Sequence, residues 1–228
     1  ADAGEERYTL GLRVAGAKVP WLPGFDFKAE QMFQFGDTEP VSAAGTAFAN
    51  ADRDISAFAG AWGVGYTFSD VPWSPRVGYQ YAYPSGDDDN TDTDNDTFDH
   101  LYPTGHARMG YMDFHAFQNI VAHKFEFSAK PSKKLLLKAD FWNFEADQSQ
   151  DAWYGVVGGV AAGGNAAQNT NSVTGLLIDS ESYGNELDIT AKYKLFENFG
   201  VVAGYSHYWT GDYIEELFGN DDTNADWF

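Results

Sequence analysis

The alternation of apolar and polar side chains is the feature that most limits the fold of this chain. Residues 185–195 show it most regularly, with Leu187, Ile189, Ala191, Tyr193 and Leu195 set against Glu186, Asp188, Thr190, Lys192 and Lys194. Successive side chains of a β-strand point to opposite faces, so this period predicts a strand with one apolar and one polar face. The pattern recurs in residues 6–15, 24–36, 55–68, 75–84, 118–129, 134–144 and 199–210. Eight strands are therefore expected, and no segment predicts an amphipathic helix.

The connections between these segments alternate in length. Short connections follow the first, third, fifth and seventh segments, at residues 17–24, 69–74, 130–134 and 197–198. Long connections follow the other four, at residues 37–54, 85–117, 145–184 and from 211 onward. An up-and-down meander with short turns at one end and long loops at the other is typical of an outer-membrane barrel.

Charged residues of both signs occupy the polar faces of the expected strands. Burying them in a dry core would cost several kcal/mol for each unpaired charge, so these faces are expected to meet water. Aromatic residues, 17% of the chain, gather near strand ends as the girdles of a membrane barrel do. The patterns favour an all-β fold, an antiparallel up-and-down transmembrane β-barrel of the porin class, over a soluble sandwich or lipocalin-like cup.

The overall charge and the missing cysteines exclude several classes. A net charge of −20 argues against a nucleic-acid partner, because phosphate binding needs a basic surface. Without cysteine there is neither a disulfide nor a thiolate metal site. No string such as G-x-S-x-G is present, so no catalytic residue and no enzyme activity are predicted.

Strand number limits the pore. Eight strands enclose a space that side chains fill, whereas an aqueous channel needs roughly 16 to 18 strands. The last residues, "GNDDTNADWF", end in a polar loop and not in a full alternating strand. We therefore expect residues 1–228 to form a single outer-membrane β-barrel domain that is a fragment. It would be a partial barrel of about 8–10 strands that continues beyond one or both ends.

Several strings resemble the C-terminal half of the alginate-export porin family of Gram-negative outer membranes. The most specific is the order "SGDDD…FDHLYPTGH…GYMD" within residues 85–113. The other strings are "YTLGLR" (8–13), "FKAEQMFQFGD" (27–37), "SPRVGYQYAYPSGDDD" (74–89), "KPSKKLLLKADFWNFEADQSQDAWY" (130–154) and "YGNELDITAKYKLFENFGVVAGYSHYWTGDY" (183–213). Together the strings cover most of residues 8–213.

The resemblance implies a monomeric barrel in the bacterial outer membrane, in contact with membrane lipid. Its implied function is passive diffusion of an anionic polysaccharide, such as an alginate-like polyuronate, or of a related carbohydrate through a charged lumen. Two alternatives stay open at this point. One is a non-conducting structural or partner-binding barrel, and the other is a soluble β carbohydrate-binding module.

Eight basic residues on the polar strand faces are the candidate substrate-binding residues of the lumen. They are Arg7, Arg13, Lys28, Arg76, Lys124, Lys138, Lys192 and Lys194. A polyuronate carries one carboxylate per sugar, so cations along a pore wall would favour its passage. The alternative is that these cations pair across strands with acidic residues and only hydrate the wall. The candidate acidic partners are Asp26, Glu30, Glu126, Asp140, Glu186 and Asp188.

The long connection "PSGDDDNTDTDNDTFDHLYPTGH" (84–106) places seven aspartates in the thirteen residues 87–99. Clustered carboxylates suit Ca²⁺, and Asp92, Asp94 and Asp96 begin a D-x-D-x-D pattern. The sixth position of that pattern is not glycine, however, and the twelfth is Pro103. We expect a solvated extracellular loop without a cofactor, with Ca²⁺ as the alternative.

Two further features complete the predicted sites. His100, His106 and His115 have spacings that match no zinc motif, so structural roles are expected for them. The glycine-rich residues 155–169 are expected to form an outward flap, with an inward constriction as the alternative.

Overall fold

The computed structural model describes residues 4–17, 19–38, 53–89, 92–103, 108–156, 164–165, 168–169, 178–219 and 224–228. Eight long strands dominate it: β1 (Glu5–Gly16), β2 (Phe25–Thr38), β3 (Arg53–Thr67), β4 (Arg76–Pro84), β6 (Val121–Ser132), β7 (Leu135–Glu145), β10 (Ser182–Phe196) and β11 (Phe199–Thr210). The minor elements are β5 (Asp94–Asn95), β8 (Gly164–Asn165), β9 (Gln168–Asn169), β12 (Ala225–Trp227) and helix α1 (Asp212–Phe218). All eight predicted strands are confirmed.

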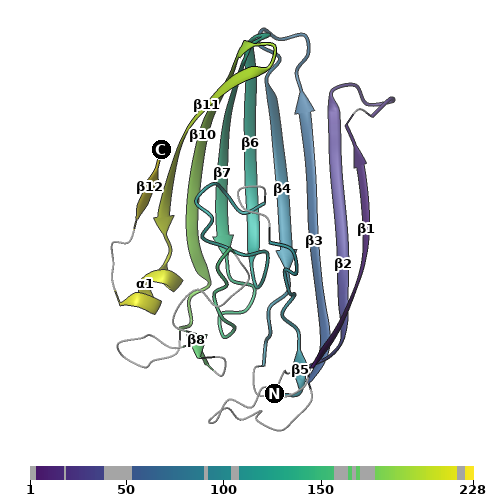
Figure 1. The fold of residues 1–228 in the computed structure, drawn as a ribbon, viewed down its shortest axis with the longest axis vertical. Helices are drawn as coiled ribbons and strands as arrows, with labels where there is room; N and C mark the ends of the chain where they lie inside the picture. The colour runs from purple at the N-terminus through teal and green to yellow at the C-terminus, as the bar shows by residue number, and fades with distance from the viewer. Residues whose placement is uncertain are drawn as a thin grey trace.

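The long strands form one antiparallel sheet in chain order, β1-β2-β3-β4-β6-β7-β10-β11, with β12 beside β11 (Figure 1). Short turns join the strand pairs at one end and the long connections lie at the other. β5 adds to β3 in parallel, and β8 and β9 pair only with each other among the described residues. β1 and β12 are the two edges, so the described residues form a partial and not a closed barrel.

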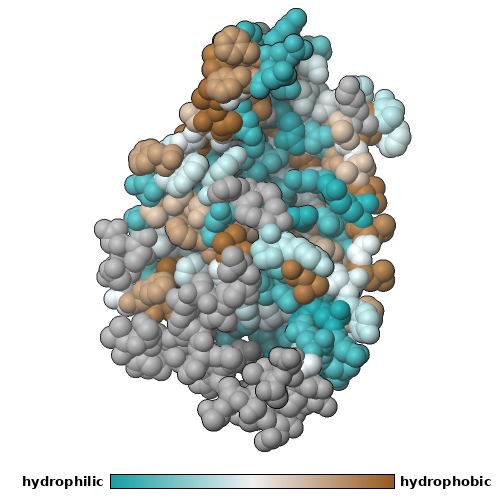
Figure 2. All heavy atoms as spheres, in the orientation of Figure 1, coloured by the Kyte–Doolittle hydropathy of each residue, from teal (hydrophilic) through white to brown (hydrophobic). Residues whose placement is uncertain are grey.

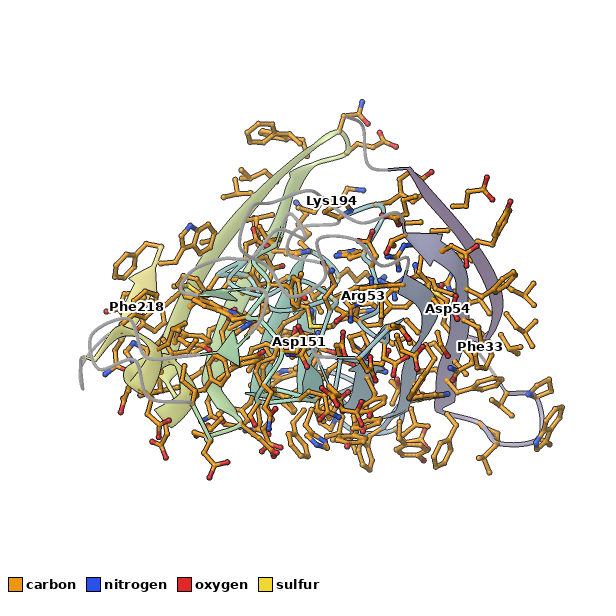
Figure 3. All side chains as sticks on the ribbon, turned by 90° about the horizontal axis from the view of Figure 1, so that it is seen from below. Phe33, Arg53, Asp54, Asp151, Lys194 and Phe218 are labelled. Carbon is orange, nitrogen blue, oxygen red and sulfur yellow. The ribbon has the colours of Figure 1, made fainter. Side chains whose placement is uncertain are left out.

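The sheet curves into a trough, which Figure 3 shows from below. Its convex face carries the predicted apolar set, and many of these side chains are exposed. They include Leu10, Leu12, Phe33, Phe35, Val64, Val77, Phe125, Phe127, Ile189 and Phe199. A soluble protein rarely exposes so continuous an apolar surface, whereas a barrel in lipid requires it.

The concave face is covered in part by the described residues of 85–120, which we call the inner loop. On this face β3 and β4 carry small side chains, among them Ala57, Ala59 and Ala82, and these are buried. Phe98, Phe117 and Ile120 of the inner loop pack against them in the main hydrophobic cluster. Burying each such large side chain stabilises this position by about 1.5–3 kcal/mol. The expectation of a solvated loop is therefore only partly right: Asp88 and Asp94 of the acidic run are exposed, but the inner loop also folds into the trough, as Figure 1 shows.

Helix α1 corrects a second expectation, since no helix was predicted. It buries Tyr213, Ile214 and Leu217, and it ends at Gly219 in the left-handed conformation that glycine adopts easily. At seven residues the helix is too short to show a repeating hydrophobic pattern in the sequence. No helix in the described ranges is long and apolar enough to cross a bilayer.

Candidate functional site

The predicted basic residues lie on the concave face, and five of the eight have a carboxylate within 4.0 Å. Arg76, at the start of β4, is the best connected. Its Nε and Nη2 donate to Asp26 at 2.8 and 2.7 Å, and its Nη1 donates to Glu126 at 3.0 Å. Asp26 and Glu126 stand in one cross-strand row, with two glycines between them. A β-carbon on one of these, Gly65, would overlap the guanidinium, so the glycine makes room for the ion pairs.

A second group links β6 and β7. Lys124 Nζ lies 3.1 Å from Glu126 Oε1 and 3.0 Å from Asp140 Oδ2. Lys138 Nζ contacts the same Asp140 oxygen at 3.0 Å. The Lys124 ammonium also lies 4.6 Å from the ring centre of Trp142, in a cation–π contact. The cations of this wall are therefore largely balanced by neighbouring carboxylates.

The remaining predicted cations near β1 and β2 differ in their pairing. Arg7 donates to Gln34 Oε1 at 3.0 Å and has Asp99 at 3.8 Å. Arg13, whose side chain is 67% exposed, has Glu30 at 3.8 Å. Lys28 forms no ion pair within 4.0 Å in the described part of the chain. Glu30 Oε2 also accepts a hydrogen bond from Arg108 Nη2 of the inner loop at 3.1 Å. Arg108 lies outside the strands, so the alternation of strand residues could not indicate it as a wall cation.

Lys192 and Lys194 lie near the short-turn end of β10, away from the carboxylates of the wall. They line one groove together with Lys130, Lys133 and Lys134. No carboxylate lies within 4.0 Å of any of these five ammonium groups among the residues that the structure describes. The eight predicted cations therefore separate into a paired set along the wall and an unpaired set at its end, with Lys28 apart from both.

Two of the predicted acidic partners, Glu186 and Asp188, bind neither lysine nor arginine among the described residues. Glu186 Oε1 accepts the backbone N–H groups of Tyr111 at 2.6 Å and Met112 at 3.0 Å. We call this pair of hydrogen bonds the loop–wall contact. Asp188 accepts from Trp142 Nε1 at 3.1 Å and from Ser206 Oγ at 2.6 Å. Both side chains are buried, Glu186 against the inner loop, where the sequence led us to expect water.

His115 of the inner loop is fully buried and hydrogen-bonded on both ring nitrogens. Trp153 Nε1 donates to Nδ1 at 3.0 Å, which leaves the proton on Nε2, 3.0 Å from the Tyr208 hydroxyl. That hydroxyl donates in turn to the carbonyl of Tyr183 at 2.7 Å. Burial lowers the pKa of His115 to about 3, so the ring is neutral and fixed in one tautomer. Its role is structural, as predicted.

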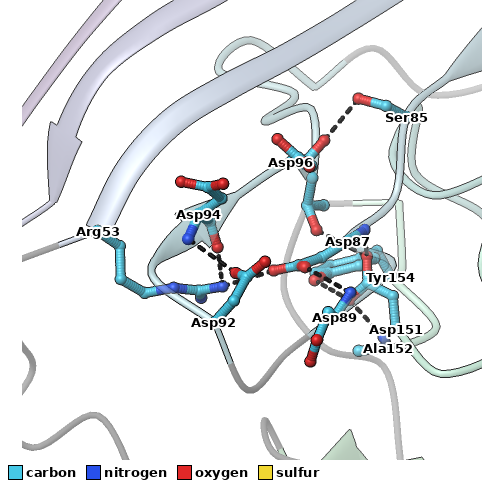
Figure 4. Close-up of polar contacts among 11 residues, drawn as sticks. Arg53, Ser85, Asp87, Asp89, Asp92, Asp94, Asp96, Asp151, Ala152 and Tyr154 are labelled. Carbon is cyan, nitrogen blue, oxygen red and sulfur yellow. Dashed lines mark hydrogen bonds and ion pairs between the residues drawn. The ribbon is translucent and has the colours of Figure 1, made fainter.

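The acidic run is held by one arginine and a buried aspartate (Figure 4). Arg53 Nη2 lies 2.6 Å from Asp87 Oδ2 and also donates to the carbonyl of Asp94. Asp151 accepts from the Asp87 amide at 3.1 Å and from Thr97 Oγ1 at 2.7 Å. Burial raises the pKa of both Asp87 and Asp151.

No group of three or more histidine or acidic side chains in the described ranges is placed to hold a metal ion. The Asp92 carboxylate accepts the backbone N–H of Asp94 at 2.8 Å, and the Asp96 carbonyl accepts from Ser85 Oγ. The expectation of a loop without a cofactor, with Ca²⁺ at Asp92, Asp94 and Asp96 as the alternative, stays a prediction. His106 and most of the glycine-rich residues 155–169 lie outside the described residues, so the expectations for them stay predictions.

A comparison with known protein families shows to which family the chain belongs. The model of the family described as alginate export matches residues 1–226. The chain belongs to the alginate export family. No curated protein matches it. Membership assigns the chain to an outer-membrane transport family and not to an enzyme family, which agrees with the apolar convex face and the charged concave face.

Proposed function

We propose that this alginate export family protein conducts an anionic polysaccharide, an alginate-like polyuronate, by passive diffusion along the concave face of its sheet. One observation supports this most directly. The concave face carries charged groups in continuous cross-strand rows, from Asp26 and Arg76 through Glu126 and Lys124 to Asp140 and Lys138. An aqueous path across lipid needs such a polar wall.

The pairing of the wall cations suits transport better than tight binding. An isolated cluster of cations would hold a polyanion in a deep well, which slows its release. Arg76 and Lys124 each share their charge with two carboxylates, so a passing uronate gains only part of either cation's attraction. Many weak contacts in series allow a polymer to be accepted and passed on.

The inner loop gives the path its restricted part. It occupies the trough beside β3 and β4 and brings Arg108 to Glu30 of the neighbouring strand β2. Beside this point lies a recess of about 220 Å³ lined in part by Gln34, His100 and Arg108. A chain of sugars moving along the concave face would pass these side chains.

Planar-bilayer recording of the reconstituted protein tests the proposal. We expect stepwise conductance, preference for anions in a KCl gradient, and transient current blocks by oligouronates but not by neutral oligosaccharides of equal length. Cation preference without oligouronate blocks would overturn it. Absence of any conductance in a correctly folded barrel would favour the alternative of a non-conducting structural or partner-binding protein, and folding without detergent would favour a soluble module.

A further inference from the structure

The short-turn end of the sheet carries a groove of about 410 Å³ whose lining includes five lysines. We call it the lysine groove. Its lysines are Lys130, Lys133 and Lys134 around the β6–β7 turn and Lys192 and Lys194 on β10. In Figure 2 the upper end, where Figure 1 places these turns, shows a hydrophilic cluster beside a hydrophobic one.

The local sequence concentrates positive charge in a strongly acidic protein. Residues 127–139 and 189–204 contain six lysines and one acidic residue, Glu197, whereas the whole chain has 34 acidic and 14 basic residues. The acidic run 87–99 lies in the loops at the opposite end of the strands. The sheet is therefore basic at its short-turn end and acidic at its loop end.

The lysines of the groove differ from those of the wall in having no counter-charge. Lys124 and Lys138 have carboxylates at about 3 Å, while no ion pair joins any of the five groove lysines to a described residue. Among these five ammonium groups, only that of Lys134 donates a hydrogen bond to a described residue, the carbonyl of Leu195 at 3.5 Å. Ammonium groups gathered in this way repel one another, and an anion that bridges them relieves the repulsion.

The two β10 lysines of the groove lie on the polar side of their strand. Lys192 and Lys194 occupy the same alternate positions of β10 as Asp188, which lies on the concave face, and Gly200 and Val202 face them from β11. A polyanion held here is therefore aligned with the wall along which it would move. A phospholipid headgroup would instead be expected on the convex, lipid-facing side.

We propose that the lysine groove captures the polyuronate at the mouth of the path and so sets the side from which it loads. Short turns of outer-membrane barrels face the periplasm, so capture at this end corresponds to export. This inference rests on the proposed function and adds a site and a direction to it. The acidic loops at the other end oppose loading from outside.

The test replaces all five lysines by glutamine in the complete protein and records oligouronate blocks in planar bilayers. With oligouronate on the short-turn side, we expect the block frequency to fall by about tenfold or more, because steering by charge controls the association rate. With oligouronate on the loop side it should change little. The wild-type frequency should also fall steeply with salt, since the screening length shrinks from about 10 Å at 0.1 M to about 3 Å at 1 M.

A matched variant with the five lysines changed to arginine should keep the wild-type frequency. Unchanged blocks in the glutamine variant, or an equal fall from both sides, would overturn the capture site while leaving the proposed function standing. Loss of co-purified phosphatidylglycerol with unchanged blocks would identify a lipid site instead. If the wild-type protein conducts but oligouronates never block it, the proposed function fails and the capture site fails with it.

Discussion

Gly110 lies directly against Glu186. A β-carbon built at position 110 would overlap the Glu186 carboxylate, and the residue has a φ of +85°, which side chains other than glycine rarely adopt. The next two residues, Tyr111 and Met112, make the loop–wall contact through their backbone N–H groups. The sharp turn at Gly110 thus directs two donors at one buried carboxylate, and the inner loop is joined to β10 at this point.

Replacing Glu186 by alanine is expected to release this part of the inner loop. The change removes the acceptor of two hydrogen bonds from backbone N–H groups, so the local free energy of opening should fall by about 2 kcal/mol or more, a rise of about 30-fold in the open population. Hydrogen exchange of residues 108–113 should speed up, and single-channel conductance should increase. Glutamine at position 186 keeps one carbonyl oxygen for the same two donors, so its effect should be clearly smaller. Equal behaviour of the two variants would contradict the role of the loop–wall contact.

Replacing Gly110 by alanine is also expected to release this part of the inner loop. It combines an unfavourable φ with overlap of the Glu186 carboxylate, which together should cost about 1–3 kcal/mol. Gly200→Ala is the control, because a β-carbon there would meet only an ordinary contact with the Tyr193 carbonyl, at 3.5 Å. Hydrogen exchange of residues 108–113 should change in the first variant and not in the second. In a double variant with Glu186→Ala, Gly110→Ala should increase the hydrogen exchange of residues 108–113 little further. Fully additive effects of the two substitutions would show that the two residues act separately.

The strands could be predicted because each repeats its pattern over nine or more residues. The inward position of the inner loop could not, because Phe98, Phe117 and Ile120 are spread over a segment without periodicity. One feature of the sequence did indicate that the inner loop packs on the sheet. Ala57, Ala59 and Ala82 stand where other strands carry charges, and an apolar, small-residue patch on the supposed polar face indicates that something packs over it.

The pairing of the wall charges was only partly predictable. The register of β6 and β7 places Glu126 beside Asp140. That register depends on the geometry of the turn between the strands, which is difficult to predict from the sequence. Glu186 and Asp188 looked like partners for lysine because they alternate with apolar residues. Their actual partners, the Tyr111 and Met112 amides and Trp142, come from a loop and from the neighbouring strand, which no local pattern reveals.

Acidification is expected to loosen the inner loop through His115. Its pKa is about 3 in the folded state and about 6.5 when exposed, so the unfolded state binds more protons between these values. The stabilisation is complete above pH 6.5 and is lost as the pH falls toward 3. At pH 4.5, two units below the exposed value, the loss should reach about 2.7 kcal/mol.

Hydrogen exchange of residues 113–119, normalised for the intrinsic pH effect, measures this loss. His115→Gln is the control, because a glutamine can accept from Trp153 and donate to Tyr208 at any pH. The variant should show a smaller change between pH 7 and pH 4.5 than the wild-type protein. The same pH dependence in both proteins would assign the effect to groups other than His115. Asp87 and Asp151 could not be those groups, because their raised pKa values favour the folded state as the pH falls.

Removing the Arg76 charge is expected to shift ion selectivity toward cations. Among the described residues Arg76 is the only ion-pair partner of Asp26, whereas Glu126 keeps Lys124 at 3.1 Å. Arg76→Gln therefore leaves one uncompensated carboxylate on the concave face, and the cation-to-anion permeability ratio should rise by about twofold or more. Reversal potentials in a KCl gradient measure this ratio.

Arg76→Lys keeps the charge but cannot bind Asp26 through two nitrogens, so it should preserve selectivity while lowering the thermal stability of the barrel. A selectivity change in the lysine variant equal to that in the glutamine variant would show that geometry, and not charge, controls the path at this residue.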